Sequence, residues 1–438
     1  MGPFSIRGSL IHRLLLCLGL VLIVGCKSSP KKQNVIIITL DTLRADHLPC
    51  YGYSKNTAPN LCAIAEQSLL FSDAYSQSSW TLPAHGSIFT GAYAWQHGAT
   101  QWETPIKDSY PMLAEKLKED GYRTGAIVST LFVGKRYGFG RGFDTFKNLG
   151  ENYSEGAVYA KRISDDAIQW LSEKKQPFFL WLHYYDMHHE FIRHDDTGFQ
   201  YLPDIPARLS YAEWNKYPTR FGDFPRHWYE NLYDGEIAFV DKHLGRVFDQ
   251  LKAQKLWENT IVIITSDHGE AFKDHNLVGH DNLVYRELTH VPLIAHIPGT
   301  GAEKRSDPVE TRQIFSTVLD LVGVQKPEGV AASLLEPSEG YAFSGVHNRN
   351  PRRRIGVMSK DWHLVYTLDE RKYELYSSQD VKEESNVFAQ HNVNALTKRL
   401  FKQMGVLSHD EDELNELKTL GYISGQPRKD DSEVVEDN

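Results

Sequence analysis

The stretches "NVIIITLD" (residues 34–41) and "TIVIITSDH" (residues 260–268) decide the fold of this chain. Each is a run of β-branched and apolar residues that stops at an aspartate, and a histidine follows the second aspartate. Runs that are apolar on both faces are typical of strands covered on both sides, as in parallel sheets. Because the carboxyl ends of parallel strands lie at the same edge of a sheet, we expect Asp41 and Asp267 to lie together there. Ligands of such sheets bind at this edge.

Further apolar runs alternate with helical patterns along the chain. Residues 123–128, 178–182 and 291–297 each read as a strand, and residues 232–251 carry apolar side chains on one face of a helix. An alternation of strands and helices is typical of layered α/β folds. The sequence therefore predicts an α/β sandwich with a largely parallel central sheet.

Three segments depart from this pattern. Residues 190–231 form an irregular insertion rich in Tyr, Trp, Phe and Pro, which is either a functional lid or a packed surface excursion. After the large domain, expected at residues 33–325, short strand-like segments predict a small α+β subdomain with an antiparallel sheet at 326–425. Residues 426–438 are expected to be an acidic, solvated tail.

The first 26 residues have the pattern of a secretion signal. Arg7, His12 and Arg13 precede an apolar run that ends at Gly25-Cys26 and is short for a membrane span. The end of this run resembles a bacterial lipoprotein lipobox, in which Cys26 is lipidated. We therefore expect an exported lipoprotein of the bacterial cell envelope, held to the membrane through Cys26. An ordinary signal peptide or an N-terminal anchor is the alternative.

Charge and cysteine content exclude some classes of partner. The net charge is −9, so the bulk surface offers no electrostatic footprint for nucleic acid, and we expect none as a partner. Besides Cys17 and Cys26, the chain holds only Cys50 and Cys62, and neither lies in a metal-binding CxxC pair. In an oxidising compartment these two can form a disulfide or remain separate thiols.

Two aspartates that converge at one sheet edge repel each other unless a cation lies between them. Asp41, Asp267 and His268 therefore predict a metal site. The alternative for a single aspartate at a strand end is a helix N-cap.

The segment "SSWTLPAHGSIFTG" (residues 78–91) predicts the start of a helix, with Thr81 near the N-cap and His85 one turn further on. A helix N-terminus attracts anions, and a hydroxyl beside a metal can act as a nucleophile because the cation lowers its pKa. The alternative is that Thr81 only caps the helix.

Several stretches, in their order and spacing, resemble the sulfatase family within the alkaline phosphatase superfamily. They are "NVIIITLDTLRADHLPCYGY", the segment around "SSWTLPAHGSIFTG", "FFLWLHYYDMHHEF", "YDGEIAFVDKHLGRVFDQL", "TSDHGE", "VPLI" and "KYELYSSQDVKEESNV". The resemblance runs along nearly the whole chain after residue 26. It implies an alkaline-phosphatase/sulfatase-like fold, with residues 33–325 as the catalytic domain.

The resemblance also implies roles for individual residues. Asp41, Asp267 and His268 would bind one divalent cation, with Thr81 close to it. The metal in such sulfatases is usually calcium, although a histidine ligand also suits zinc or manganese. His188 falls where the family has a histidine that contacts the ester or its leaving group. His183 and His189 lack this support and are interpreted as structural.

The chain departs from the family at three places. The signature C/S-x-P-x-R, whose first residue is oxidised to formylglycine, here reads Thr81-Leu-Pro-Ala-His85. Oxidation of a threonine gives a ketone and not the required aldehyde, so no formylglycine is expected. The second of the family's paired aspartates is Thr42. The substrate-binding lysine is replaced around His280-Asp281, where the histidine can still donate to an ester oxygen.

These observations predict a metal-dependent hydrolase of sulfate or phosphate esters with Thr81, His85, His188 and His280 as catalytic residues. The expected partner is a sulfated or phosphorylated small molecule or glycan. Three alternatives remain open: a Thr-nucleophile phosphodiesterase, a phosphotransferase, and a non-catalytic glycan-binding lipoprotein. A dimetal phosphodiesterase would need a second ligand set, which Asp186, His188 and His280 would supply if they converge.

Overall fold

The computed structural model describes residue 2 and residues 32–151, 159–188, 190–209, 225–280, 283–346, 353–391, 396–397 and 399. The described residues from 33 onward belong to one compact unit. The predicted signal peptide and the acidic tail lie outside the described residues. A search of the described helices finds none that is both long and apolar enough to span a bilayer.

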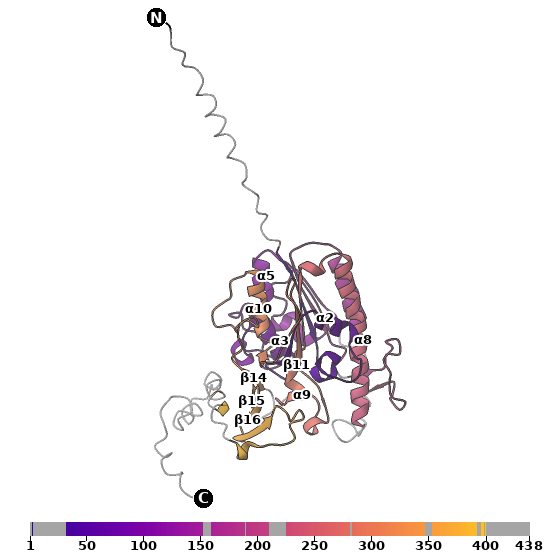
Figure 1. Cartoon of the computed structure of the whole chain (residues 1–438), viewed down its shortest axis with the longest axis vertical. Helices are drawn as coiled ribbons and strands as arrows, with labels where there is room; N and C mark the ends of the chain where they lie inside the picture. Colours follow the sequence, from indigo (N-terminus) through magenta and orange to yellow (C-terminus); the bar gives the residue numbers. More distant parts are fainter. Residues whose placement is uncertain are drawn as a thin grey trace. The chain divides into compact units, whose positions relative to one another are not determined.

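A mixed central sheet is the core of the molecule (Figure 1). In the described part of the chain it has nine strands in the order β12-β2-β11-β8-β1-β5-β3-β4, with β13 paired to β2. The strands are β1 (Asn34–Leu40), β2 (Leu69–Tyr75), β3 (Arg123–Val128), β4 (Thr145–Asn148), β5 (Phe178–Tyr184), β8 (Thr260–Thr265), β11 (His290–His296), β12 (Glu303–Arg305) and β13 (Val309–Glu310).

Strand β1 lies in the middle of this sheet and is fully buried. It pairs in parallel with β5 on one side and with β8 on the other, with Thr39 opposite His183 and Thr265. Because the three strands run in the same direction, the residues that follow them meet at one edge. The predicted α/β sandwich with a largely parallel sheet is confirmed.

Strand β11 is the exception within the sheet. It runs antiparallel to both of its neighbours, β2 and β8. The apolar run "VPLIAH" looks like the parallel strands because burial on both faces, and not strand direction, produces an uninterrupted apolar sequence.

Helices cover both faces of the sheet. Ile36 and Ile38 of β1 face the core that contains helices α2, α6 and α8, whereas Val35 and Ile37 face the core that contains α3, α5 and α10. Figure 1 shows α8 on one side of the sheet and α5 and α10 on the other. The described helices are α2 (Pro59–Ala65), α3 (Thr81–Thr90), α4 (Ala94–His97), α5 (Leu113–Glu119), α6 (Ala160–Leu171), α8 (Arg226–Ala253), α9 (Arg286–Thr289) and α10 (Gln313–Val322).

Short 3-10 turns and two small hairpins connect these elements. The turns are η1 (Ala45–His47), η2 (Pro49–Tyr51), η3 (Leu131–Val133), η4 (Lys135–Tyr137), η5 (Trp257–Asn259), η6 (Asp274–Asn276) and η7 (Phe388–Gln390). The hairpins pair β6 (Phe191–Ile192) with β7 (Arg208–Leu209), and β9 (Ala271–Phe272) with β10 (Val278–Gly279).

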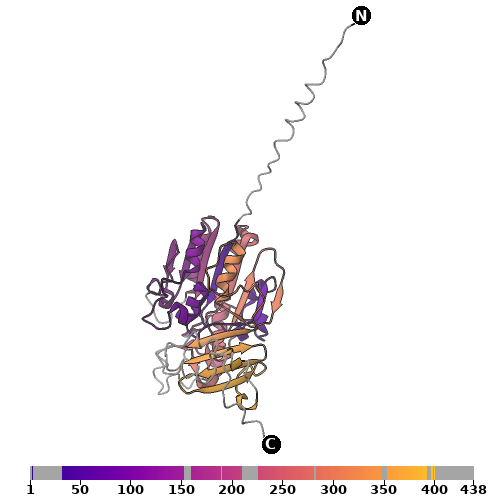
Figure 2. The ribbon, with the colours of Figure 1, turned by 90° about the vertical axis from the view of Figure 1, so that its left-hand side faces the viewer.

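A second, antiparallel sheet follows the large domain, as the sequence predicts. Its strands are β14 (Tyr341–Val346), β15 (Arg354–Ser359), β16 (Trp362–Thr367) and β17 (Lys372–Ser377), in sequential order. Figure 2 shows them side by side in orange and yellow. The exact subdomain bounds, 326–425, remain a prediction.

The aromatic insertion is shorter than the sequence pattern suggests. Its last part, from Arg226 onward, already belongs to α8, which therefore begins six residues before Leu232. Residues 210–224 lie outside the described part, so the choice between a lid and a surface excursion remains a prediction.

Cys50 in η2 and Cys62 in α2 are joined by a disulfide, with their Cα atoms 5.4 Å apart. Of the two alternatives left open by the sequence, the structure thus contains the disulfide.

Candidate active site

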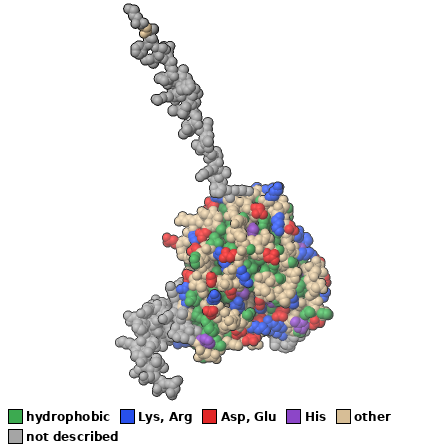
Figure 3. Space-filling view, in the orientation of Figure 1, with side chains coloured by type: hydrophobic (Ala, Val, Ile, Leu, Met, Phe, Trp, Pro, Cys, Tyr) green, Lys and Arg blue, Asp and Glu red, His purple; other side chains and the backbone are tan. Residues whose placement is uncertain are grey.

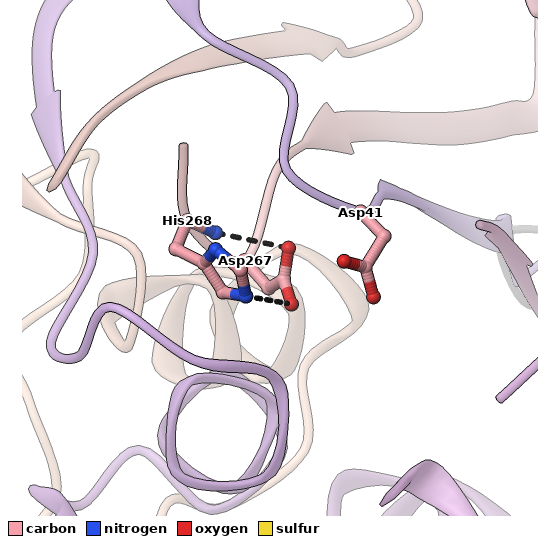
Figure 4. A group of neighbouring side chains, drawn as sticks. All are labelled: Asp41, Asp267 and His268. Carbon is pink, nitrogen blue, oxygen red and sulfur yellow. Dashed lines mark hydrogen bonds and ion pairs between the residues drawn. The ribbon is translucent and has the colours of Figure 1, made fainter. Parts of the chain in front are cut away.

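Asp41, Asp267 and His268 lie together at the carboxyl ends of β1 and β8. Each is fully buried, and one ligand atom from each lies within 4.8 Å of the others. Figure 4 shows the two carboxylates facing one another, with the His268 ring beside Asp267. This is the one group of three potential metal ligands found among the described residues. The strand-end pattern thus predicted their convergence correctly.

The ligand atoms of this group fit a cation. Asp41 Oδ1 and Asp267 Oδ2 are buried and accept no hydrogen bond from the described residues. His268 Nδ1 lies 2.9 Å from the carbonyl oxygen of Gly269, to which it must donate, so Nε2 carries a lone pair. This Nε2 lies 3.3 Å from Asp267 Oδ2. Two carboxylate oxygens and the lone pair of one imidazole nitrogen therefore converge, which is the chemistry of a divalent-metal site.

The electrostatics of the two carboxylates point the same way. Burial, followed by repulsion from Asp267 and Glu270, raises the pKa of Asp41 well above its usual range. Burial also raises the pKa of Asp267, against the opposing effect of His85. A cation between them would offset both the desolvation and the repulsion.

Thr81 reaches the same group from helix α3. It is the first residue of the helix and follows Trp80, whose extended backbone forms the N-cap. Its Oγ1 lies 3.5 Å from His268 Nε2, and its hydroxyl stabilises the charge of the Asp41 carboxylate. The hydroxyl therefore stands between the candidate ligands and the N-terminus of α3, where backbone N–H groups favour an anion.

His85 lies one turn further along α3 and is fully buried. Its Nδ1 donates to the Thr81 carbonyl oxygen at 2.9 Å, and its Nε2 lies 3.1 Å from Thr39 Oγ1. Trp181 Nε1 donates to the same Thr39 oxygen at 2.9 Å, which leaves the Thr39 hydroxyl proton for His85 Nε2. Burial lowers the pKa of His85, in agreement with a neutral ring.

Both ring nitrogens of His85 are therefore engaged inside the protein. The sequence pattern predicts His85 around the transferring group, whereas the structure places it beneath Thr81, where it holds the start of α3. A direct contact between His85 and an ester is not supported by this geometry.

His188 and His280 are brought together, although 92 residues separate them. Their Nε2 atoms lie 2.9 Å apart, so one ring donates to the other. The His188 ring stacks on Tyr185, and the His280 ring centroid lies 4.4 Å from that of His268. The pair thus borders the Asp41–Asp267–His268 group, in a position to exchange a proton with a bound ligand.

His183 belongs to the site, although the sequence suggests only a structural role for it. It is fully buried, and its Nε2 donates to Asp41 Oδ2 at 3.0 Å. Its Nδ1 faces the N–H and hydroxyl of Ser129 at 3.4 and 3.3 Å. Burial lowers the pKa of His183 well below its usual range, so the ring is neutral. The available signal was its position at the end of an apolar run at the same sheet edge.

Thr42 replaces an expected acidic ligand without taking over its role. Its hydroxyl oxygen lies 2.7 Å from the carbonyl oxygen of Asp41 and 2.8 Å from that of Met187, so its proton is shared between backbone acceptors. Its own N–H donates to Asp267 Oδ1 at 3.2 Å. Its φ of 58° is uncommon for a β-branched residue. Such strained backbone conformations cluster at functional sites.

Asp186 does not join His188 and His280 in a second ligand set. Its Oδ1 accepts the backbone N–H groups of Tyr159 and Ala160 at 2.9 and 3.0 Å, at the start of α6. The carboxylate therefore serves as a helix cap. His189 lies outside the described residues.

Comparison with known proteins agrees with this architecture. Residues 33–324 match the family model described as Sulfatase. The chain belongs to the sulfatase family. It is 24% identical over 394 residues to the Delta 4,5-hexuronate-2-O-sulfatase of Bacteroides thetaiotaomicron, covering 80% of this chain and 79% of the relative. Because members of the family hydrolyse sulfate esters, the chain is a sulfatase-family hydrolase that acts on ester bonds.

Solved structures share the fold at lower identity. A protein in complex with D-glucosamine-2-N,6-O-disulfate, described as its substrate, superposes with a TM-score of 0.70 at 19% identity over 89% of this chain and 98% of that one. The phosphonate monoester hydrolase of Agrobacterium radiobacter gives a TM-score of 0.68 at 19% identity over 86% and 95%. The same fold therefore serves esters of sulfur and of phosphorus.

Proposed function

We propose that this protein hydrolyses sulfate or phosphate esters with Thr81 as the nucleophile and one divalent cation as cofactor. The observation that carries the proposal is the position of the Thr81 hydroxyl, at the N-terminus of α3, beside Asp41 and 3.5 Å from His268 Nε2. Asp41, Asp267 and His268 would hold the cation, with calcium, zinc or manganese as candidates. When bound, the cation would lower the pKa of the hydroxyl and neutralise charge on the ester.

The chemistry proceeds in two displacements. Thr81 Oγ1 gives up its proton and attacks the sulfur or phosphorus atom, the bond to the leaving oxygen breaks, and that oxygen takes up a proton, so the number of protons is unchanged. Water then attacks the sulfuryl or phosphoryl group on Thr81, Oγ1 leaves with one proton of that water, and the sulfate or phosphate product is released. The N–H groups at the start of α3 would stabilise the negative charge on the transferred group in both steps.

The His188–His280 pair would supply the proton for the leaving oxygen. Its two Nε2 atoms share one proton across 2.9 Å, and this proton would pass to the leaving oxygen when the hydrogen bond between the two rings opens. Proton transfer by a positioned histidine is effective near neutral pH. His85 would act by holding the Thr81 backbone, and no formylglycine takes part.

The threonine at position 81 supports a phosphorus ester as the substrate. A formylglycine hydrate expels sulfate through its second hydroxyl, and threonine has none. The threonine adduct must therefore be cleaved by water, as in phosphoserine-type hydrolysis. A Thr-nucleophile phosphodiesterase is the neighbouring proposal. A sulfate ester also stays open to test, because the relatives that match along 80% and 74% of this chain are sulfatases.

Activity measurements on three substrate types test the proposal. The protein would be assayed with an aryl sulfate, an aryl phosphate monoester and a bis-aryl phosphodiester, each with Ca²⁺, Mn²⁺ and Zn²⁺. We expect at least one substrate to be hydrolysed, and Thr81→Ala to lose about a thousandfold or more in kcat. Thr81→Ser should keep measurable turnover because it retains a hydroxyl.

Thr90→Ala is the matched control. Thr90 lies in the same helix, is equally buried, and donates to the Gly86 carbonyl oxygen away from the site. Its activity should stay close to that of the wild type. Full turnover by Thr81→Ala would overturn the nucleophile assignment. Tight binding of a sulfated glycan without turnover under any metal would favour a glycan-binding lipoprotein, which the loss of the formylglycine precursor also suggests.

The protein would act in the cell envelope, anchored through a lipidated Cys26, on a sulfated or phosphorylated small molecule or glycan. The motif at residues 14–26 supports this location. Metabolic labelling with palmitate should mark the wild type and not Cys26→Ser. Equal labelling of both would contradict lipidation at this residue.

A further inference from the structure

Three aromatic rings lead from the nucleophile segment to the protein surface. Trp80 is buried and meets Phe132 edge to face, with 5.8 Å between ring centroids. Phe132 in turn meets Trp102 at 5.0 Å. Trp102 is 43% exposed, and Leu131, next to Phe132, is 41% exposed. We call Trp80, Trp102, Leu131 and Phe132 the aromatic platform.

The platform is continuous with the candidate active site in two ways. Trp80 immediately precedes Thr81 and is the N-cap residue of α3. The second connection runs through Ser129, which lies between β3 and η3. Its hydroxyl donates to the carbonyl oxygen of His183, a residue of the candidate site, at 2.7 Å. Helix α3 and η3 pack against each other. The platform therefore begins at the residue next to Thr81 and ends at the exposed Trp102.

Exposure of large apolar side chains is rare in this protein. Among the described residues only five are exposed, namely Trp102, Leu131, Leu202, Leu335 and Val381. Two of these five belong to the platform. Grouped exposed apolar side chains beside a catalytic site are typical of ligand contacts.

A cation borders the platform. Arg136, in η4, is exposed and lies over the Tyr137 ring, with 5.5 Å from its Cζ to the ring centroid. The Tyr137 ring centroid lies 6.3 Å from that of Phe132. Within the described part of the chain Arg136 makes no ion pair, so its charge is available to an anionic ligand. On the face shown in Figure 3, charges of both signs are interspersed.

We propose that the aromatic platform, with Arg136, is a subsite for a pyranose ring of an anionic glycan whose ester is cleaved at Thr81. This inference rests on the proposed function and names its substrate class. A pyranose has one face of C–H groups that stacks on an indole, and hydroxyl groups at its edge that stay in water. A half-exposed Trp102 suits such a ring, whereas an acyl chain requires an enclosed apolar cavity.

Binding measurements in a background without turnover test the subsite. The Thr81→Ala protein would be titrated by calorimetry with D-glucosamine-2-N,6-O-disulfate and with a sulfated heparin tetrasaccharide. The tetrasaccharide should bind more tightly. Adding Trp102→Ala should weaken its binding about tenfold, and Trp102→Phe should restore most of the affinity. Arg136→Gln should reduce the affinity for the tetrasaccharide and its dependence on salt.

Leu131→Ala and Leu335→Ala form a matched pair, because the two leucines are equally exposed, at 41%, and only Leu131 lies on the platform. Only Leu131→Ala should weaken tetrasaccharide binding. In the otherwise wild-type protein, Trp102→Ala should raise the KM for an esterified tetrasaccharide more than the KM for an aryl sulfate or aryl phosphate.

The possible results separate the subsite from the catalytic proposal. Absence of tetrasaccharide binding, or equal binding by the Trp102→Ala variant, would overturn the subsite. A rise in the KM for the aryl ester alone would assign the platform to an aryl group and also overturn it. Because binding is measured without turnover, a failure of hydrolysis by the wild type would leave this result unaffected.

Discussion

At the residue scale, His183 shows how the candidate metal site is held in shape. Its Nε2 donates to Asp41 Oδ2, and this contact leaves Asp41 Oδ1 as the oxygen directed at the cation position. The backbone N–H of Ser129 donates to the opposite nitrogen of the ring, Nδ1, at 3.4 Å. A histidine that orients a carboxylate ligand in this way contributes to metal affinity without touching the metal.

Replacing His183 should therefore weaken metal binding more than it alters the fold. We expect His183→Leu to lower the affinity for Ca²⁺ or Mn²⁺ by about 10–100-fold, measured by titration calorimetry. His183→Gln is the matched variant because it retains an N–H donor at a similar reach, and it should lose less affinity. Equal affinities of wild type and His183→Leu would contradict this role.

The residues that follow strands were predictable from the sequence, and those that support them were not. Asp41, Asp267 and His268 come directly after apolar runs, so the direction of the strands alone brings them together. The Trp181–Thr39–His85 chain depends instead on the registry of β1 with β5 and on the depth of α3. No local pattern contains that information, and the contact of His85 was therefore expected on the wrong side of Thr81.

At the scale of elements, a disulfide links η2 to α2 beside the central sheet. The Cys50–Cys62 bond closes a loop of 12 residues. The hydroxyl oxygen of Tyr51, within this loop, accepts a hydrogen bond from the backbone N–H of Leu293 at 2.8 Å. The loop is therefore bound to β11 as well. Restricting such a loop in the unfolded chain stabilises the folded state.

Removal of this bond should lower stability and leave the chemistry intact. We expect the double variant Cys50→Ala/Cys62→Ala to lose about 3 kcal/mol of unfolding free energy in urea titrations. A reductant should bring the wild type to the same level and leave the double variant unchanged. No effect of reductant on the wild type would show that the bond does not contribute.

Strand existence was easier to predict than strand direction. The run at 291–297 is as apolar as its parallel neighbours. Strand β11 is nevertheless antiparallel, because the connection through η6 and α9 stays at the end of the sheet where β8 stops and does not cross to the other end. The first helical turns of α8 were hidden within the aromatic insertion, since Trp228 and Tyr229 share the composition of the residues before them.

At the scale of the whole molecule, His275 joins the large domain to the segment after β17. Its Nδ1 donates to Glu287 Oε1 at 2.8 Å, and its Nε2 donates to the Glu383 carbonyl oxygen at 3.1 Å. Burial alone would lower the pKa of His275, but its contacts with Glu287 and Glu383 outweigh this and raise it to about 9. The doubly protonated ring is therefore the form that the folded state favours.

This raised pKa gives stability a defined pH dependence. The protonated His275 ring contributes fully to the unfolding free energy below pH 6.5, the pKa of histidine in the unfolded chain. This contribution is lost as the pH rises through about 9, the pKa of His275 in the folded state. We expect the unfolding free energy of the wild type to fall between pH 6.5 and 9, and this fall to be smaller in Glu287→Gln, as measured by urea titration at several pH values.

His391→Gln is the control for this experiment. His391 is exposed, and its ring contacts the Val387 carbonyl oxygen at 3.3 Å. The unfolding free energy of His391→Gln should therefore change with pH in the same way as that of the wild type. Identical slopes for the wild type and Glu287→Gln would contradict the role of His275.

The central position of β1 has a consequence for biosynthesis. This strand is made before every other strand of its sheet, yet its neighbour β8 begins 226 residues later. At typical translation rates this interval lasts about 10–45 s. During that time the edge of this uncharged, β-branched strand that later pairs with β8 has no partner, which is a condition under which nascent chains associate with one another. Recombinant yield of this protein should therefore depend on slow expression and on chaperones that cover the first strand until the eighth has emerged.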